Sequence, residues 1–384
     1  MIKVLTACTE ELDDLTSSVE LLLERLDLEH SLLKNSVGLL ACCADSVTTG
    51  LVSALAARLP FDLVGVNTLG SATPGGGGQL VLSLAVLTSD DVSFSAGLSD
   101  SLEGGYEKGL RDLYDRVAGP LPEKAALMLS FVPVLKGKVP LDLLVKHLDA
   151  ISGNIPIFGM LPSDFTAFFR KPLVIYNDQV REDSFAMVLV SGNIKPRFRV
   201  SSIPENKIMK RKAIVTASEA NILKEVNGIA VIEYMKSLGL VREGKISGTQ
   251  TIPLIVDCND GTPPAVYAIY GQTPEGYAVL GGTAPVNSTI GIGTIDADDV
   301  LESAERLVET TLNERRDFLL VGSCVVRNFA LKWKNRAELD LFRSGLGENP
   351  FLFAYTGGEI CPVRDSDGRL VNRFHNLALT TCAF

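Results

Sequence analysis

The sequence lacks most of the features that identify an enzyme or a membrane protein. It has only three histidines among 384 residues, and it contains none of the dinucleotide, P-loop, zinc-protease or serine-hydrolase motifs. A histidine-rich metal centre is therefore excluded. No apolar run approaches the roughly 20 residues of a membrane-spanning helix. The N-terminus meets acidic residues at once, unlike a signal peptide, so we expect no membrane insertion.

Positive charge is scarce as well. The chain has 36 Lys and Arg against 46 Asp and Glu, which gives a formal net charge of −10 at pH 7. Such an acidic chain repels phosphate backbones and anionic membrane surfaces, so we expect no nucleic-acid partner. A basic stretch, Lys207–Lys212, is interpreted as a solvated edge or a linker.

Disulfides and zinc sites are not indicated either. The seven cysteines are an odd number, and no Cys-x-x-Cys pair occurs among them. We interpret them as reduced, buried thiols, with disulfides as the alternative. This interpretation predicts a cytoplasmic protein, and we expect no metal ligands.

What the sequence does contain is enough apolar residues for more than one core. Hydrophobic residues make up 46% of the chain, and 384 residues exceed the usual size of one hydrophobic core. We therefore predict two domains, residues 1–210 and residues 211–384, that divide near the basic stretch.

Three parts of the chain repeat one order of predicted elements: strand, helix, strand, turn and strand. The units are predicted at residues 37–87, 125–192 and 318–383, and Thr68 of the first aligns with Thr356 of the third. The first unit is expected to contain one helix that ends at Ala57. The pattern predicts an α/β fold in which each domain has a mixed sheet flanked by helices.

Polar residues follow the buried strands of the third unit. One strand runs into Thr356, two glycines and Glu359, and Arg327 follows another. Strand ends form the natural crevice in such folds. A guanidinium binds a carboxylate and a carboxylate accepts an ammonium, so the pair would suit a zwitterionic amino acid. The alternative is that Arg327 and Glu359 pair with each other as a structural salt bridge.

Three further residues are candidates. His375 and Asn376 occupy the predicted closing strand, and either could form hydrogen bonds with a ligand; the alternative is that they bond only to neighbouring strands. Cys324 would be a nucleophile only with a lowered pKa, and its alternative is a buried, small apolar residue.

The order of these motifs resembles the FIST family (F-box and intracellular signal transduction) over nearly the whole chain. The likeness to a FIST N-terminal domain rests on T-E-E-L-D-D, G-L-L-A-C-C and L-V-G-V-N-T-L-G. The likeness to a FIST C-terminal domain rests on E-V-N-G-I-A-V-I-E-Y-M-K-S-L-G-L, T-P-E-G-Y-A-V-L-G-G, G-S-C-V-V-R, F-A-Y-T-G-G-E-I and F-H-N-L-A-L. The family's Cys-x-Gly-Arg is represented here by Cys324-Val325-Val326-Arg327.

The resemblance implies a bacterial sensory protein, not an enzyme, that binds a small ligand with amino acids favoured and signals to a separate output protein. The implied ligand-binding residues are Arg327, Tyr355, Thr356, Glu359, His375, Asn376, Cys324 and Thr68. A haem-binding gas sensor, with His375 or a cysteine as axial ligand, is the alternative that involves a cofactor. Two more interpretations are an unrecognised enzyme that uses Cys324 or Glu359, and a protein that only binds partners.

Overall fold

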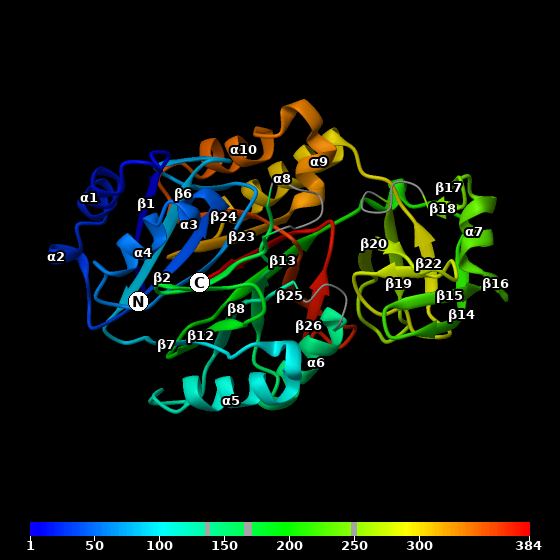
Figure 1. The fold of residues 1–384 in the computed structure, drawn as a ribbon, viewed down its shortest axis with the longest axis horizontal. Coiled ribbons are helices and arrows are strands. Elements are labelled where there is room, and N and C mark those ends of the chain that lie inside the picture. Colours follow the sequence, from blue (N-terminus) through cyan, green and yellow to red (C-terminus); the bar gives the residue numbers. More distant parts are fainter. Residues whose placement is uncertain (135–138, 165–170, 247–251) are drawn as a thin grey trace.

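The computed structural model describes residues 1–134, 139–164, 171–246 and 252–384. Within these ranges the chain forms a large body and a smaller β domain at one end of it (Figure 1). Both termini lie in the body, and residues 213–292 form the small domain. In the described ranges, no helix is long and apolar enough to cross a membrane.

The body contains three six-stranded sheets. In order across the sheet, the first consists of β1 (Lys3–Thr9), β6 (Leu82–Ser89), β2 (Asn35–Cys42), β3 (Leu63–Asn67), β10 (Val174–Tyr176) and β11 (Gln179–Arg181). The second consists of β7 (Ser93–Leu98), β12 (Ala186–Ser191), β8 (Leu127–Phe131), β9 (Ile157–Met160), β25 (Glu359–Arg364) and β26 (Leu370–His375). The third consists of β13 (Arg197–Ser201), β27 (Leu379–Ala383), β23 (Leu319–Cys324), β24 (Phe351–Thr356), β4 (Ser71–Thr73) and β5 (Gly76–Gly78).

All three sheets follow one plan. The first and second strands of each repeat are parallel neighbours: β2 with β3, β8 with β9, and β23 with β24. Parallel neighbours need a crossover connection, and each repeat supplies helices there. The closing strand then returns antiparallel on the other side of the first strand. The predicted α/β fold with repeated strand–helix–strand–turn–strand units is therefore confirmed.

The hairpin of each repeat joins the sheet of a different repeat. Hairpin β4–β5 of the first unit extends the third sheet, β10–β11 of the second unit extends the first sheet, and β25–β26 of the third unit extends the second. This cyclic exchange ties the three units together. No unit can complete its own sheet without the hairpin of another.

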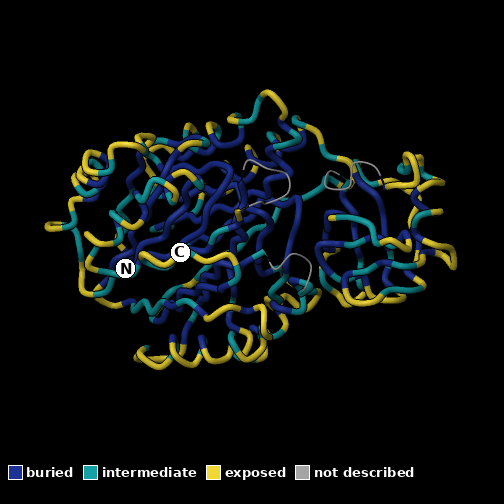
Figure 2. Tube along the Cα trace, viewed as in Figure 1, coloured by how far each residue is buried: buried dark blue, intermediate teal, exposed yellow. Residues whose placement is uncertain are grey.

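The core has a central part and three outer parts. Apolar side chains from all three sheets meet in the central core. The strands of the body are largely buried, and much of the exposed backbone lies in the helices and loops around them (Figure 2). In β2, Leu39 and Ala41 face the central core while Leu40 and Cys42 face the helices, as the two-residue period of a strand requires. The helices of the body are α1 (Leu15–Leu26), α2 (Leu28–Ser31), α3 (Ala44–Thr48), α4 (Leu51–Ala56), α5 (Tyr106–Ala118), α6 (Leu141–Ser152), α8 (Ala297–Leu312), α9 (Val325–Leu331) and α10 (Ala337–Leu346).

Two local predictions are wrong. The single helix expected to end at Ala57 is two helices, α3 and α4, because Gly50 between them has a φ of 88°. The closing strand expected to contain His375 and Asn376 is two strands, since β26 ends at His375 and β27 belongs to another sheet. The chain turns between them at Leu377, which has a φ of 52° and a fully buried side chain.

The small domain is inserted between β13 and α8, ahead of the third repeat. Its sheet consists of β14 (Ala213–Glu219), β22 (Thr289–Ile292), β19 (Pro253–Asp257), β20 (Ala265–Gln272), β21 (Ala278–Leu280), β15 (Ile222–Val226) and β16 (Ile229–Ala230). Helix α7 (Val231–Ser237) and the ribbon of β17 (Val241–Arg242) and β18 (Lys245–Ile246) complete it. The predicted boundary at residue 210 falls where the chain enters this domain, and the division into residues 1–210 and 211–384 stays a prediction.

Candidate functional site

The turns that follow the second strand of each repeat meet in the middle of the body. The Ser163 hydroxyl accepts a hydrogen bond from the Leu69 amide at 2.9 Å and donates one to the Tyr355 carbonyl at 2.6 Å. The Leu161 carbonyl accepts from the Gly357 amide at 3.0 Å. Residues from all three units thus share one buried network. The carboxyl ends of the parallel strands meet there, where a crevice is expected in α/β sheets.

Glu359 is a fully buried carboxyl group at this meeting point. The Thr356 hydroxyl donates a hydrogen bond to Glu359 Oε1, and Oε2 has no hydrogen-bond partner among the described residues. Burial raises the pKa of Glu359 well above its usual range. The hydrogen bond from Thr356 and the charge of Arg327 both lower this pKa, but burial has the larger effect. Burial therefore favours the uncharged form of Glu359.

Arg327 does not pair with Glu359, so the alternative of a salt bridge between the two is wrong. Its guanidinium binds Glu338 of α10 instead, with Nη2 at 2.7 Å and Nε at 3.0 Å from Oε1. Nη2 also donates to Ser303 at 2.8 Å, and Glu338 Oε2 accepts from Ser323 at 2.8 Å. Both charged side chains are completely buried. Glu338 thus occupies the Nε–Nη2 edge of the guanidinium, and Nη1 has no hydrogen-bond partner among the described residues.

Two other predicted residues, Tyr355 and Thr68, are also buried. Tyr355 is 1% exposed and packs edge-on against Phe353, with ring centroids 4.9 Å apart. Burial, and after it the Glu338 carboxylate, raises the pKa of Tyr355 well above its usual range, which places its hydroxyl near the Arg327 pair. Thr68 is buried in the equivalent turn of the first unit. The predicted residues thus separate into an Arg327 group and a Glu359 group.

His375 and Cys324 belong to the Glu359 group. His375 is opposite Glu359 in the register of β25 and β26, and its Nε2 donates to the Cys361 carbonyl at 3.0 Å. Burial lowers the pKa of His375 to about 4, with Arg373 acting in the same direction, so the imidazole is neutral at pH 7. Burial, followed by the nearby Glu359, raises the pKa of the Cys324 thiol. Such a thiol is a poor nucleophile.

Two hypotheses stay predictions: haem bound by His375 or a cysteine, and an enzyme that uses Cys324 or Glu359. An axial haem ligand at His375 would have to be Nδ1, because a carbonyl only accepts and Nε2 must therefore carry the proton. An absorption spectrum of haem-reconstituted protein tests the haem hypothesis. Loss of turnover on Cys324→Ala, with folding unchanged, tests the enzyme hypothesis.

Within the described ranges, no group of three or more His, Cys, Asp and Glu residues is placed to hold a metal ion.

Asn376 fastens the small domain to the body. Its Oδ1 accepts from the Ala268 amide at 3.2 Å, its Nδ2 donates to the Tyr270 hydroxyl at 3.0 Å, and its backbone amide donates to the Val266 carbonyl at 3.1 Å. A Cβ at Gly281 would overlap Asn376 Oδ1, so only glycine allows this close approach. A predicted ligand-binding residue therefore lies in the joint between the two parts of the molecule.

A second set of contacts lies beside Asn376. Arg373 of β26 donates hydrogen bonds to the Thr262 hydroxyl and the Pro263 carbonyl of the small domain. The rings of Tyr267 and Phe374 stack with centroids 6.5 Å apart and planes inclined by 12°. The end of β26 and the turn after it thus bind the small domain, and the Thr283 hydroxyl adds a hydrogen bond to Asp142 of α6.

A cavity of about 540 Å³ lies at this joint, between β13, β25 and β26 of the body and residues 263–266 of the small domain. We call it the junction groove. Its lining includes His375 and three arginines, Arg197, Arg199 and Arg364. A larger, open cavity of about 920 Å³ lies near Phe61, at the starting ends of β2 and β3, and none of the predicted site residues lines it. The junction groove is therefore the better candidate site.

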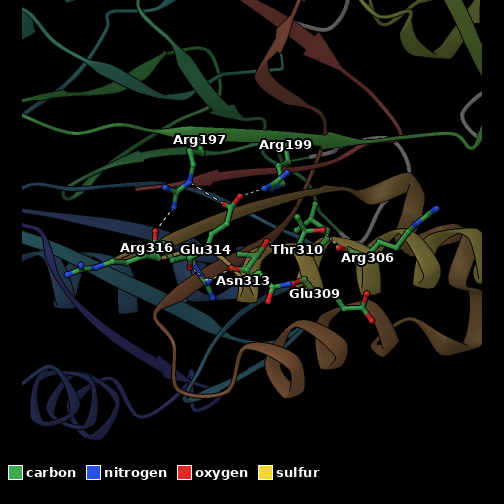
Figure 3. Close-up of polar contacts among 11 residues, drawn as sticks. Arg197, Arg199, Arg306, Glu309, Thr310, Asn313, Glu314 and Arg316 are labelled. Atoms are coloured by element: carbon green, nitrogen blue, oxygen red, sulfur yellow. Dashed lines mark hydrogen bonds and ion pairs between the residues drawn. The ribbon is translucent and has the colours of Figure 1, made fainter. Parts of the chain in front are cut away.

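The arginines of β13 share a single carboxylate. Figure 3 shows Arg197 and Arg199, two residues apart on one strand, reaching Glu314 from either side. The Arg197 Nε lies 3.3 Å from Glu314 Oε2, and Arg199 forms a hydrogen bond with Oε1. Burial lowers the pKa of Arg316, and the nearby positive charge of Arg197 lowers it further. Positive charge therefore exceeds negative charge on this side of the groove.

The sequence reasoning missed several residues of the site. The stretch R-F-R-V at 197–200 alternates charged and apolar residues, which is the signal of a strand with two guanidinium groups on one face. That signal could have identified Arg197 and Arg199. Tyr270 and Glu338 had no comparable signal, since each acts through a contact with a residue from a different element.

Comparison with protein families agrees with this architecture. The family model of the FIST N domain matches residues 36–229, and that of the FIST C domain matches residues 230–362. The border between the two matches lies in β16, inside the small domain. No curated protein matches the chain. FIST domains are associated with signal transduction and sensing. Because the two matches run together from residue 36 to residue 362, the chain belongs to the FIST family, with a FIST N domain followed by a FIST C domain.

Proposed function

We propose that the protein is a cytoplasmic sensor that binds a small carboxylate-bearing ligand, with amino acids as the leading class, in the junction groove. The observation that carries the proposal is the position of the groove. It is lined by both the body and the small domain, beside the residues that hold the two together. A ligand there would contact both parts at once. Small-molecule sites occur preferentially at such junctions, and 540 Å³ is within their usual size range.

The charges of the groove favour a carboxylate. Arg197 and Arg199 have Glu314 as a shared partner, and Arg364 forms no ion pair among the described residues. The Arg364 guanidinium donates to the Gly368 carbonyl at 2.6 Å, which leaves other donors of its planar fork for a ligand. Guanidinium groups bind carboxylates in two-point geometry, so an excess of arginine suits this ligand class.

The rest of the groove favours a ligand with an apolar part. Pro263, Pro264 and Val266 of the small domain face Leu370 and other apolar residues of the body across the groove. A zwitterionic amino acid would also need a partner for its ammonium group. Glu359 is adjacent, opposite His375 in the strand register, and would become charged if an ammonium approached. We include Glu359 in the proposal for that reason.

The small domain provides a way to transmit occupancy. A ligand that contacts both walls favours the arrangement in which they are close, and it shifts the population of the docked state by its difference in affinity. The contacts of Asn376 and Arg373 would then report the ligand to the surface of the small domain. A separate output protein would read that change.

The first test is ligand binding. We expect a carboxylate ligand at a hundred times its Kd to raise the free energy of unfolding by about 2.7 kcal/mol, which thermal unfolding against a panel of amino acids will detect. Arg364→Gln should weaken binding about tenfold or more, because it removes a charge-assisted hydrogen bond. Arg369→Gln is the matched control, since Arg369 lies in the same hairpin and is 77% exposed. No shift across amino acids and simple carboxylates would rule out this ligand class.

The second test is coupling through Asn376. Asn376→Ala removes two side-chain hydrogen bonds and leaves the Ala268 amide unpaired, so we expect a loss of about 1–3 kcal/mol in stability. Hydrogen exchange should rise in β20 and β21 and remain slow in the central core. Asn372→Ala is the control, because Asn372 bonds only to Asp149, Ile155 and Ile157 within the body. Unchanged exchange in β20 would show that Asn376 does not couple the two parts.

A further inference from the structure

Trp333 is the single tryptophan of the chain, and it is 82% exposed. It lies in the short 3-10 turn Lys332–Lys334 that follows α9. An indole ring is large and mostly apolar, and it is usually buried in a monomer. Tryptophan is also the residue type most enriched among those that dominate binding energy at protein interfaces. Its exposure therefore indicates a contact made with another molecule.

The backbone before Trp333 is strained. Lys332 has a φ of 54° and a ψ of −119°, a combination that side-chain-bearing residues rarely adopt. Residues with such backbone angles are concentrated at functional sites. Lys332 ends α9 and begins the turn that carries the exposed indole of Trp333.

Trp333 forms one wall of a groove of about 630 Å³ between the turn and the start of α8. We call it the α9 groove. Ile295, Val326, Phe329 and Leu331 supply apolar lining beside the indole. Val326 and Leu331 are themselves buried, so they form a firm floor. The groove is separate from the junction groove and shares no lining residue with it.

The charges at the groove indicate what it binds. Lys332 and Lys334 flank the indole, and Lys334 Nζ lies 5.4 Å from the ring centroid. Neither lysine has an ion-pair partner among the described residues. On the facing wall, Asp296 is paired with Lys207 at 2.8 Å, and Asp298 is the remaining acidic group. The Trp333 end of the groove is thus a basic patch in a chain of net charge −10.

We propose that the α9 groove binds an acidic segment of a partner protein that carries an apolar anchor residue. The anchor would enter between Trp333 and Phe329, and acidic residues beside it would pair with Lys332 and Lys334. A membrane surface also attracts tryptophan and lysine, but the net charge of −10 repels the anionic lipids that such lysines would need. The inference does not depend on which ligand the junction groove binds.

Selection from a random peptide library tests the proposal. Phage-displayed peptides of about twelve residues are selected on the full chain and counter-selected on Trp333→Ala protein. We expect the selected peptides to be enriched in Asp and Glu around an apolar residue. Their binding should shift the emission of Trp333 to shorter wavelength, since the indole loses water. Affinity should fall at least tenfold in Trp333→Ala and in Lys332→Glu/Lys334→Glu protein, which corresponds to about 1.4 kcal/mol or more.

The control is Leu312→Ala, which removes another exposed apolar side chain (47% exposed) and should leave peptide affinity unchanged. Circular dichroism confirms that each variant is folded. Three results would overturn the proposal. In the first, the selected peptides bind Trp333→Ala protein as well as they bind the wild type. In the second, anionic vesicles shift the emission of Trp333 and the peptides do not. In the third, the chain forms a dimer that Trp333→Ala dissociates.

Discussion

Glu338→Ala should lower the free energy of unfolding by about 3–5 kcal/mol, because it leaves the buried Arg327 guanidinium without a counter-charge. Arg327 would keep only the Ser303 hydroxyl and the Val300 carbonyl as partners, and Ser323 would lose its acceptor as well. Desolvating an unpaired cation is the dominant cost. Urea unfolding of both proteins at neutral pH measures the difference.

Two controls separate the buried charge from the loss of contacts. The double variant Arg327→Met/Glu338→Met should be more stable than Glu338→Ala, since it removes both charges and keeps the apolar volume. Glu20→Ala breaks the exposed pair of Glu20 and Arg58, whose side chains are 57% and 52% exposed, and should change stability by less than about 1 kcal/mol. A Glu338→Ala loss as small as that of Glu20→Ala would contradict the buried-pair interpretation.

The same pair limits what sequence can predict about a site. Arg327 follows a buried strand, as a ligand-binding arginine would, and the sequence alone suggested Glu359 as its partner. The true partner, Glu338, lies eleven residues further along, near the start of the next helix. A polar residue at the start of a helix is usually exposed to solvent and caps the backbone amides of the helix. Only the packing of α10 against α8 and α9 turns Glu338 inward.

The fold was predictable where it depends on local periodicity. The apolar strands around Val37, Leu127 and Leu319 and the amphipathic helices between them follow from spacing, and the threefold repeat follows from their order. The exchange of hairpins between units was not predictable. Strands β4, β5, β10 and β11 have three residues each, too few for a periodic signal, and their partners lie in other repeats.

The candidate site was predictable only in part for the same reason. Cys324, Thr356 and His375 were found because they lie at or near the ends of predicted strands of one repeat, and Glu359 because it follows the turn after Thr356. The structure brings the four together. The junction groove depends on the insertion of the small domain and on the path of β13. Both are long-range features. A single sequence does not indicate which strand lies beside an inserted domain.

Glu359→Gln should make the protein more stable at alkaline pH, and this prediction bears directly on the proposed site. Burial raises the pKa of Glu359 in the folded state, so folding favours its protonated form. That contribution is fully present below the unfolded pKa of about 4.3 and is lost as pH rises through the folded pKa. Glutamine resembles the protonated acid at every pH. The stability curves of the two proteins should therefore be close near pH 4 and diverge above it.

The divergence should widen as the pH rises above 4 and level off once the pH exceeds the folded pKa. Urea unfolding across the pH range measures it, and Glu348→Gln, at an exposed position, should follow the wild-type curve. A ligand ammonium that charges Glu359 would release a proton on binding, which calorimetry in buffers of different ionisation enthalpy detects. Glu359→Gln should abolish that release and weaken binding. A Glu359→Gln curve parallel to the wild type would show that the buried carboxyl group is not protonated in the folded protein.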